Sequence, residues 1–255
     1  MFTGKVRAII GMTTFNSECL SLSVPPISRL PQDFLLIIYN TNPSHSITVR
    51  DIRKLGYRGR LRIVNSTQDI DLMSARLGVL DVAHRFAPNA QWIVFINDTD
   101  MLLDLRIPDV SPNNFAVIQN AAYVNDNLLD VLRLMRSVDL HTLDGVDAEF
   151  FRPHIGMAGT MVRMFSAHKM AEILRRVHET ISKACVDAAS VDAVMWAVLN
   201  NIMRGDDVIN TPIYMDSVNL VRITPRGRGR DISEKTTRLV ADCLAIVDAV
   251  MTSEN

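Results

Sequence analysis

Four short apolar runs lie in the first hundred residues, and each ends in polar, turn-forming residues. The runs cover residues 6–12, 34–39, 61–64 and 92–96. Continuous apolar runs such as FLLIIY at 34–39 are typical of strands that are covered on both faces. The pattern therefore predicts four strands of a buried sheet.

An amphipathic helix is predicted between the third and fourth runs, over residues 71–87, with Asp71 placed to stabilise its amino end. Strands that alternate with helices imply parallel strands joined by right-handed crossovers. Such sheets bind ligands at the carboxyl ends of their strands. We therefore expect the polar strand exits to converge on one crevice.

The second half of the chain shows a looser, α+β pattern. Strands are expected at 115–123, 208–215 and 218–223, helices at 127–138, 167–184, 191–203 and 233–251, and a surface loop at 139–153.

Composition favours one large core, because 255 residues with 48% hydrophobic content suffice for a single domain. Lys and Arg number 27 against 28 Asp and Glu, so nonspecific coating of nucleic acid or an anionic membrane is not expected. Cys19, Cys185 and Cys243 lie far apart, which indicates neither a disulfide framework nor a zinc site. No apolar stretch resembles a signal peptide or a membrane span, so a cytoplasmic location is expected.

The sequence Asp98-Thr99-Asp100 directly follows the most hydrophobic run. Its two carboxylates would lie at the carboxyl end of a strand, where they can coordinate a hard divalent cation that neutralises a diphosphate. The alternative is that Asp98 and Asp100 only cap a turn or a following helix, which Asp does often.

Four segments resemble, in order, the family 2 glycosyltransferases with the GT-A fold. They are VRAIIGMTTFN at 6–16, LLIIYNTNPSHS at 35–46, IDLMSARLGVLDVAH at 70–84 and WIVFINDTDML at 92–102. The resemblance implies an α/β fold with a Rossmann-type mixed, mainly parallel sheet flanked by helices. It implies one domain over 1–255, with a nucleotide-sugar-binding half at 1–104 and an α+β acceptor-side half at 105–255.

The resemblance also assigns roles to individual residues. Asp100 would be the principal ligand of Mn²⁺ or Mg²⁺, and Asp98 would contact both nucleotide and metal. Asn40 stands where an acidic residue is usual, and Leu77 stands where Asn is usual. The nucleotide-sugar site would comprise Thr13, Thr14, Asn16, Asn40, Arg76 and Asp98. From the residues alone, an arginine such as Arg76 on an amphipathic helix faces water or pairs with a carboxylate.

On the acceptor side, HIGMAGTMVR at 154–163 resembles the family's acceptor loop and strand, which makes His154, Gly156 and Gly159 acceptor-side candidates. The glycines have the alternative role of shaping a turn. Asp192 lies where the family has the second residue of Glu-Asp before a helix, and it would be the catalytic base. Its alternative role is to stabilise the first helical turn.

Two weaker sets of candidates complete the sequence-based picture. Asp147 and Glu149 are reserve bases, and a third metal ligand is not identifiable. The arginine cluster Arg226, Arg228 and Arg230 suits a diphosphate or an anionic acceptor, or else forms a solvated turn.

The expected function is metal-dependent transfer of a sugar from a nucleoside diphosphate donor to a hydroxyl acceptor, with inversion implied by the resemblance. The acceptor class stays open among a saccharide, a lipid-linked glycan, a protein and a nucleic-acid base. A nucleotidyltransferase is an alternative, although the chain lacks a Gly-rich, Lys-containing loop after its first strand. The other alternative is a degenerate GT-A domain that serves as a binding or assembly module. It is supported by Asn40, Leu77 and Val191, which depart from the residues usual in the family.

Overall fold

The structure is a computed structural model of the whole chain. It describes residues 5–30, 33–105, 107, 117–118, 121–125, 151–153, 161–181, 191–192, 194–199, 218–223, 241–242, 245–246 and 249.

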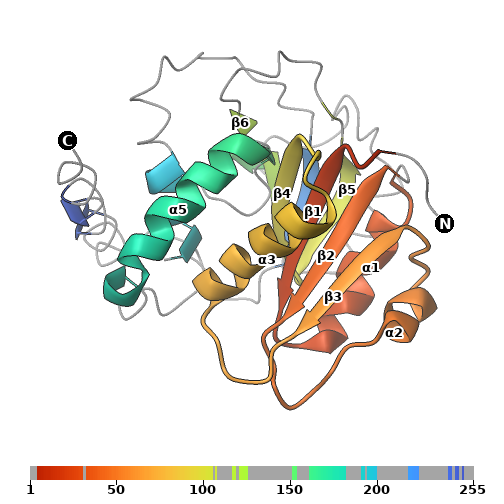
Figure 1. Cartoon of the computed structure of the whole chain (residues 1–255). Helices are drawn as coiled ribbons and strands as arrows, with labels where there is room; N and C mark the ends of the chain where they lie inside the picture. Colours follow the sequence, from red (N-terminus) through yellow and green to blue (C-terminus); the bar gives the residue numbers. More distant parts are fainter. Residues whose placement is uncertain are drawn as a thin grey trace.

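The central sheet has six strands in the order β3-β2-β1-β4-β9-β6 (Figure 1). Strands β1, β2, β3 and β4 run parallel, and β9 pairs antiparallel with both β4 and β6. The bounds are β1 Ala8–Thr14, β2 Phe34–Asn40, β3 Arg60–Asn65, β4 Trp92–Asn97, β6 Val117–Ile118 and β9 Met161–Arg163. The four predicted strands and the mostly parallel sheet are confirmed, and the architecture is compatible with a Rossmann-like fold.

Helix α3, Leu72–Phe86, follows β3 and confirms the helix predicted at 71–87. Asp71 caps it, because its Oδ1 atom accepts a hydrogen bond of 2.8 Å from the backbone amide of Ser74. Helix α5, Met164–Ile181, begins three residues before the predicted helix at 167–184. An ion pair of 2.6 Å between Arg175 and Asp81 joins the two helices.

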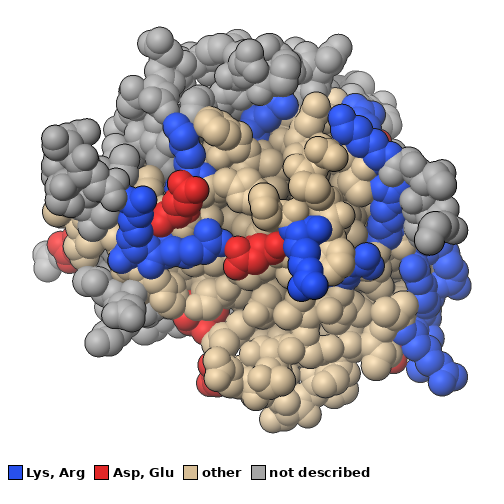
Figure 2. Space-filling view, in the orientation of Figure 1, with Lys and Arg blue, Asp and Glu red and all other residues tan. Residues whose placement is uncertain are grey.

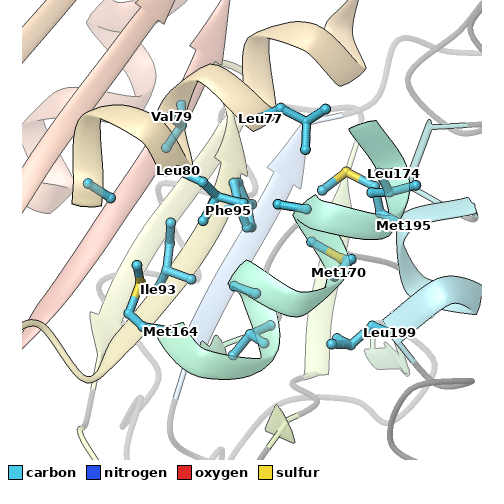
Figure 3. Close-up of a cluster of buried hydrophobic side chains, with 14 of the residues drawn as sticks. Leu77, Val79, Leu80, Ile93, Phe95, Met164, Met170, Leu174, Met195 and Leu199 are labelled. Atoms are coloured by element: carbon cyan, nitrogen blue, oxygen red, sulfur yellow. The ribbon is translucent and has the colours of Figure 1, made fainter. Parts of the chain in front are cut away.

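Both faces of the parallel sheet are buried, which explains why its strands do not alternate. One face carries Ile9, Ile37 and Phe95 and packs against α3 and α5 (Figure 3). The other carries Ile10, Leu36 and Val94 in a second hydrophobic cluster. That second cluster also contains side chains from α1, α2 and β5, namely Leu20, Val24, Ile27, Ile52, Leu102 and Leu105.

A second sheet has the strand order β5-β10-β7-β8. Its strands are β5 Asp100–Leu105, β7 Ala121–Asn125, β8 Phe151–Pro153 and β10 Val218–Ile223. The strand predicted at 218–223 is confirmed, but the single strand predicted at 115–123 is wrong. That segment contributes β6 to one sheet and β7 to the other. The end of the loop predicted at 139–153 is also wrong, because β8 pairs with β7 there.

Three short helical elements were not predicted: η1 Ser17–Cys19, α1 Leu20–Ile27 and α2 Val49–Lys54. Pro25 and Pro26 lie inside α1 and hide its helical pattern. Thr48 and Asp51 form a capping box at the start of α2, which is a signal that the sequence did contain.

Farther along the chain, residues 191–192 and 194–199 are helical, in agreement with the helix predicted at 191–203. Residues 241–242, 245–246 and 249 are helical within the helix predicted at 233–251. The helix predicted at 127–138 and the strand predicted at 208–215 lie outside the described residues.

Charge is unevenly distributed over the face of the molecule in Figure 2. Acidic and basic groups interleave over α3 and α5, whereas Lys and Arg side chains gather along the side that carries α2 and β3. Within the described ranges, no helix combines the length and the apolar character that crossing a membrane requires.

Candidate functional site

The polar exits of the parallel strands converge, as the sequence predicts. Thr14 ends β1, Asn40 ends β2 and Asn65 ends β3, while Asp98 follows β4 directly. In the strand register Thr14 lies beside Asn40 and Asn40 lies beside Asn65. These residues therefore share one edge of the sheet, the edge at which α/β proteins bind ligands.

Thr14 connects three of these exits. Its hydroxyl donates a hydrogen bond of 2.7 Å to Oδ2 of Asp98. Its carbonyl accepts from the amide of Thr41 at 2.8 Å and from the Thr41 hydroxyl at 3.2 Å. The exit of β1 is thus fixed to the loops that follow β2 and β4.

Asn40 organises the loop after β2. It is almost completely buried, with its Oδ1 accepting from the amide of Asn42 at 3.1 Å and its Nδ2 donating to Oδ1 of Asn65 at 3.0 Å. Asn65 in turn accepts from the amide of Ile47 at 2.8 Å. An amide performs this task better than a carboxylate would, because it donates and accepts together. Loop organisation is therefore a physical reason for Asn at position 40.

Asp98 is a partly buried carboxylate in a charged neighbourhood. Burial raises the pKa of the Asp98 carboxyl above its ordinary value, and the negative charge of Asp100 adds to the rise. Hydrogen bonds from the Thr14 hydroxyl and from the backbone at Asn16 and Phe15 oppose it. The negative charge of this group is therefore disfavoured on balance, and a nearby cation would relieve that cost.

Asp100 is not in a turn, as the sequence suggested, but is the first residue of β5. Its side chain is completely buried, and its Oδ2 accepts a hydrogen bond of 2.8 Å from the amide of Asn97. In the antiparallel pairing of β5 with β10, Arg222 lies opposite Asp100. In the strand register, the first residue of the basic stretch 222–230 is therefore paired with Asp100.

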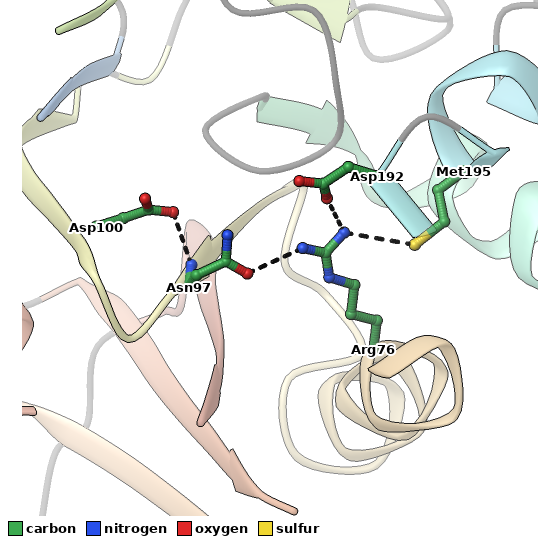
Figure 4. A network of polar contacts seen from close by, with 5 residues as sticks. All are labelled: Arg76, Asn97, Asp100, Asp192 and Met195. Carbon is green, nitrogen blue, oxygen red and sulfur yellow. Dashed lines mark hydrogen bonds and ion pairs between the residues drawn. The ribbon is translucent and has the colours of Figure 1, made fainter. Parts of the chain in front are cut away.

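A buried polar network joins the two halves of the chain (Figure 4). Arg76 on α3 is fully buried and forms an ion pair with Oδ1 of Asp192, and it donates to the Asn97 side chain at 3.1 Å. A weaker contact of 3.8 Å reaches the sulfur of Met195. Because Asn97 also donates to Asp100, the network runs from Asp192 through Arg76 and Asn97 to Asp100.

This network brings together three residues that the sequence analysis singled out separately, Arg76, Asp100 and Asp192. The ion pair with Asp192 also confirms the alternative role of Arg76, which is to pair with a carboxylate. The second oxygen of Asp192 is buried and has no hydrogen-bond partner among the residues that the structure describes, and it points away from Arg76 (Figure 4).

Sequence reasoning missed Asn97 and Met195. Asn97 offered one signal, since it directly precedes Asp98 at the end of a buried strand. Met195 offered none, because thioethers are ordinary core residues.

The chemistry of the carboxylates fits a divalent cation, although both groups also hold the fold. A carboxylate has about four acceptor positions, so one that accepts a hydrogen bond, as Asp98 does from Thr14 and Asp100 does from Asn97, can also bind a metal. Hard oxygen ligands suit Mg²⁺ or Mn²⁺. Among the described residues no group of three or more His, Cys, Asp or Glu side chains is arranged to hold a metal ion, so no third ligand is identified.

Two further candidates have structural surroundings of their own. Thr13 is buried in β1, and its hydroxyl has no hydrogen-bond partner within the described part of the chain. Asn16 caps η1 by accepting a hydrogen bond of 3.1 Å from the amide of Glu18. The other candidates lie outside the described residues: His154, Gly156, Gly159, Asp147, Glu149, Arg226, Arg228 and Arg230.

One aromatic residue at this edge was not singled out by the sequence. Phe15 follows β1 directly, and its side chain is 60% exposed although it is large and apolar. Its carbonyl accepts a hydrogen bond of 3.2 Å from the Asn42 side chain, which places it between the loops after β1 and β2. An exposed ring at such a position suits stacking with a planar group of a ligand.

No protein-family model matches this sequence, and no curated protein is significantly similar to it. The function is therefore argued from the residues of the site.

Proposed function

We propose that this chain is a glycosyltransferase of the GT-A type that moves a sugar from a nucleoside diphosphate to a hydroxyl acceptor. One observation carries the proposal: the candidate base Asp192 and the candidate metal ligand Asp100 belong to the same buried network, although they are far apart in the sequence. Arg76 and Asn97 connect them, at the sheet edge that binds ligands in α/β proteins.

The donor nucleotide would lie across the exits of β1 and β2. Thr14, Asn40 and Thr41 fix these loops, so the backbone that meets the ligand is ordered before binding. Phe15 offers its exposed ring to the nucleobase. The diphosphate would then lie toward Asp98 and Asp100.

Mn²⁺ or Mg²⁺ held by Asp98 and Asp100 would stabilise the negative charge of the departing diphosphate. The unpartnered oxygen of Asp192 would take the proton of the acceptor hydroxyl as its oxygen bonds to the anomeric carbon. The bond from that carbon to the phosphate oxygen breaks, and its electron pair leaves with the diphosphate. Attack opposite to the leaving group inverts the anomeric centre.

The basic stretch after β10 supports the same placement of the diphosphate. Arg222 lies opposite Asp100 in the register, and β10 ends at Ile223. Arg226 follows three residues later, which limits it to within about 11 Å of Ile223 along the chain. Arginines held this close to Asp100 by the chain would be suited to bind the phosphate oxygens of the diphosphate.

A binding module without catalysis is the second candidate, and the ion pair between Arg76 and Asp192 favours it. A buried carboxylate that is paired with a buried guanidinium already has a structural role, since buried charges are costly unless they are paired. Such a module would bind the nucleotide and turn over no donor.

The proposal is tested by thermal unfolding of the purified protein with uridine, guanosine, adenosine and cytidine diphosphates and their sugar esters, each with and without Mn²⁺. We expect one nucleotide series to raise the Tm only when Mn²⁺ is present, because a ligand that binds the folded state stabilises it. The Asp100→Asn variant should lose that increase. Release of free sugar or diphosphate from the same donor separates an enzyme from a binding module. No shift with any nucleotide would contradict the proposal.

A further inference from the structure

A cavity lies at the opposite end of the parallel sheet from the candidate site. It is a cleft of about 500 Å³ at the amino ends of the strands. Its walls come from the residues before β1, the start of β2, the start of β3 and the connection between α3 and β4 at 86–90. We call it the basic cleft.

Four basic side chains line the basic cleft, and none of its described lining residues is acidic. They are Lys5, Arg53, Arg60 and Arg62. The whole chain has a formal net charge of −1, so this is a local excess of positive charge. Figure 2 shows Lys and Arg side chains gathered along the side of α2 and β3, to which three of the four belong or lie adjacent.

Contacts within the cleft hold two of the guanidinium groups in place without neutralising them. Arg53 donates a hydrogen bond of 2.8 Å to the carbonyl of Tyr57. Arg62 lies over the ring of Phe86, with 4.4 Å between the guanidinium carbon and the ring centroid. Within the described part of the chain, no carboxylate lies within ion-pair distance of either arginine. Both keep further N–H donors for a ligand, because a guanidinium carries five.

The walls also offer an apolar surface. Leu35 and Leu61 line the cleft, and Phe86 exposes 45% of its side chain. Planar guanidinium groups and an ammonium group recognise phosphate oxygens, and a cavity of this volume is within the range that binds small molecules. A small molecule with an apolar part and several phosphate oxygens would match both surfaces.

We propose that the basic cleft is a second ligand site, which binds a small phosphorylated compound carrying at least two phosphate groups. The site is separate from the proposed donor site, because the two lie at opposite ends of the strands. Its occupancy requires neither Asp98 nor Asp100, and its existence does not depend on the proposed function.

The test is isothermal titration of the full chain with inorganic pyrophosphate and, separately, tripolyphosphate, at about 0.15 M salt so that weak surface attraction is screened. No divalent cation is added. The Lys5→Ser/Arg62→Ser double variant removes two cations whose side chains are exposed. Arg29→Ser is the matched control, since Arg29 is exposed and does not line the cleft. Circular dichroism verifies that each variant is folded.

We expect saturable binding with one site per chain, a Kd at least about tenfold weaker in the double variant, and an unchanged Kd in Arg29→Ser and Asp100→Asn. No saturable binding, or an equal loss in Arg29→Ser, would overturn the proposal. A short single-stranded RNA that binds more tightly than tripolyphosphate and loses its binding in the double variant would also overturn it, in favour of a nucleic-acid surface.

Discussion

Arg76 and Asp192 form a buried ion pair between two side chains that lie 116 positions apart in the sequence. Their side chains expose 0% and 4% of their surface. Charges buried this deeply are costly unless they are paired, so the pair fixes the helical segment around Asp192 against α3. It also aligns Asn97, and through it Asp100, at the carboxyl edge of the sheet.

The first prediction concerns this pair. Arg76→Met should lower the free energy of unfolding by about 3–5 kcal/mol, because Asp192 then stays buried without its partner. The double variant Arg76→Met/Asp192→Leu should recover most of that loss, since neither charge remains. Urea unfolding of the wild type, both single variants and the double variant measures the coupling. If the double variant loses as much free energy of unfolding as the two single variants lose together, the ion pair contributes nothing to stability.

The second prediction concerns the exposed ring at the edge of the site. Phe15→Ala should weaken nucleotide binding by about tenfold or more, because stacking of a base on an aromatic ring contributes about 1–3 kcal/mol. Stability should change little, as the side chain is 60% exposed. Phe165→Ala is the control, because Phe165 is equally exposed and is the second residue of α5, near the other end of β4. Equal effects of the two variants on the nucleotide Kd would refute the stacking role.

The third prediction concerns Gly78, which lies in the middle of α3. A Cβ atom at this position would overlap the Cε2 atom of Tyr39 in β2. Replacing Gly by Ala inside a helix ordinarily stabilises it by about 0.5–1 kcal/mol. Here Gly78→Ala should instead destabilise the protein by about 1–3 kcal/mol, as overpacking does.

Chemical unfolding of Gly78→Ala and of Gly78→Ala/Tyr39→Leu checks this explanation. The smaller side chain at position 39 should remove part of the loss. A stabilised Gly78→Ala variant would mean that the ring moves aside at no cost.

The fourth prediction concerns pH and the contact between α3 and α5. Burial lowers the pKa of His168 below its ordinary value of 6.5, and the charge of the adjacent His84 lowers it further. The two rings lie 5.4 Å apart between centroids. The folded protein therefore binds a proton at His168 less readily than the unfolded chain does. Stability that is present above about pH 6.5 is consequently lost as the pH falls below it.

Thermal unfolding between about pH 7.5 and pH 5.5 measures this dependence. His168→Gln should show a smaller fall in Tm than the wild type over that range. His45→Gln, a substitution in an exposed loop, should behave like the wild type. An identical pH dependence for His168→Gln would show that the His168 ring does not contribute.

The parallel half of the fold could be predicted because its residues carry strong local signals. Runs such as 34–39 and 92–96 are apolar on both faces, and α3 combines a clear period with the cap Asp71. Helix α1 was not predicted because two prolines interrupt its helical sequence pattern. Strand β5 was not predicted because its first residue, Asp100, is of a type that is common in turns. In addition, β5 pairs with β10, which lies far away in the sequence.

The candidate site was predictable only in pieces. Arg76, Asp100 and Asp192 each have a local signal, but no sequence pattern reveals that Arg76 and Asp192 form a pair. For Asn40 the sequence and the structure point to different roles. The surrounding sequence suggests a contact with a ligand, whereas the hydrogen bonds of its side chain hold the loop after β2.

The most direct test of the central claim is the titration of free Mn²⁺ by electron paramagnetic resonance, with the full chain and the nucleoside diphosphate identified by thermal unfolding. The account predicts that protein and nucleotide together remove Mn²⁺ from solution more strongly than the two measured separately, and that Asp100→Asn abolishes this excess while remaining folded. Mn²⁺ binding that is the same in Asp100→Asn and in the wild type would contradict it.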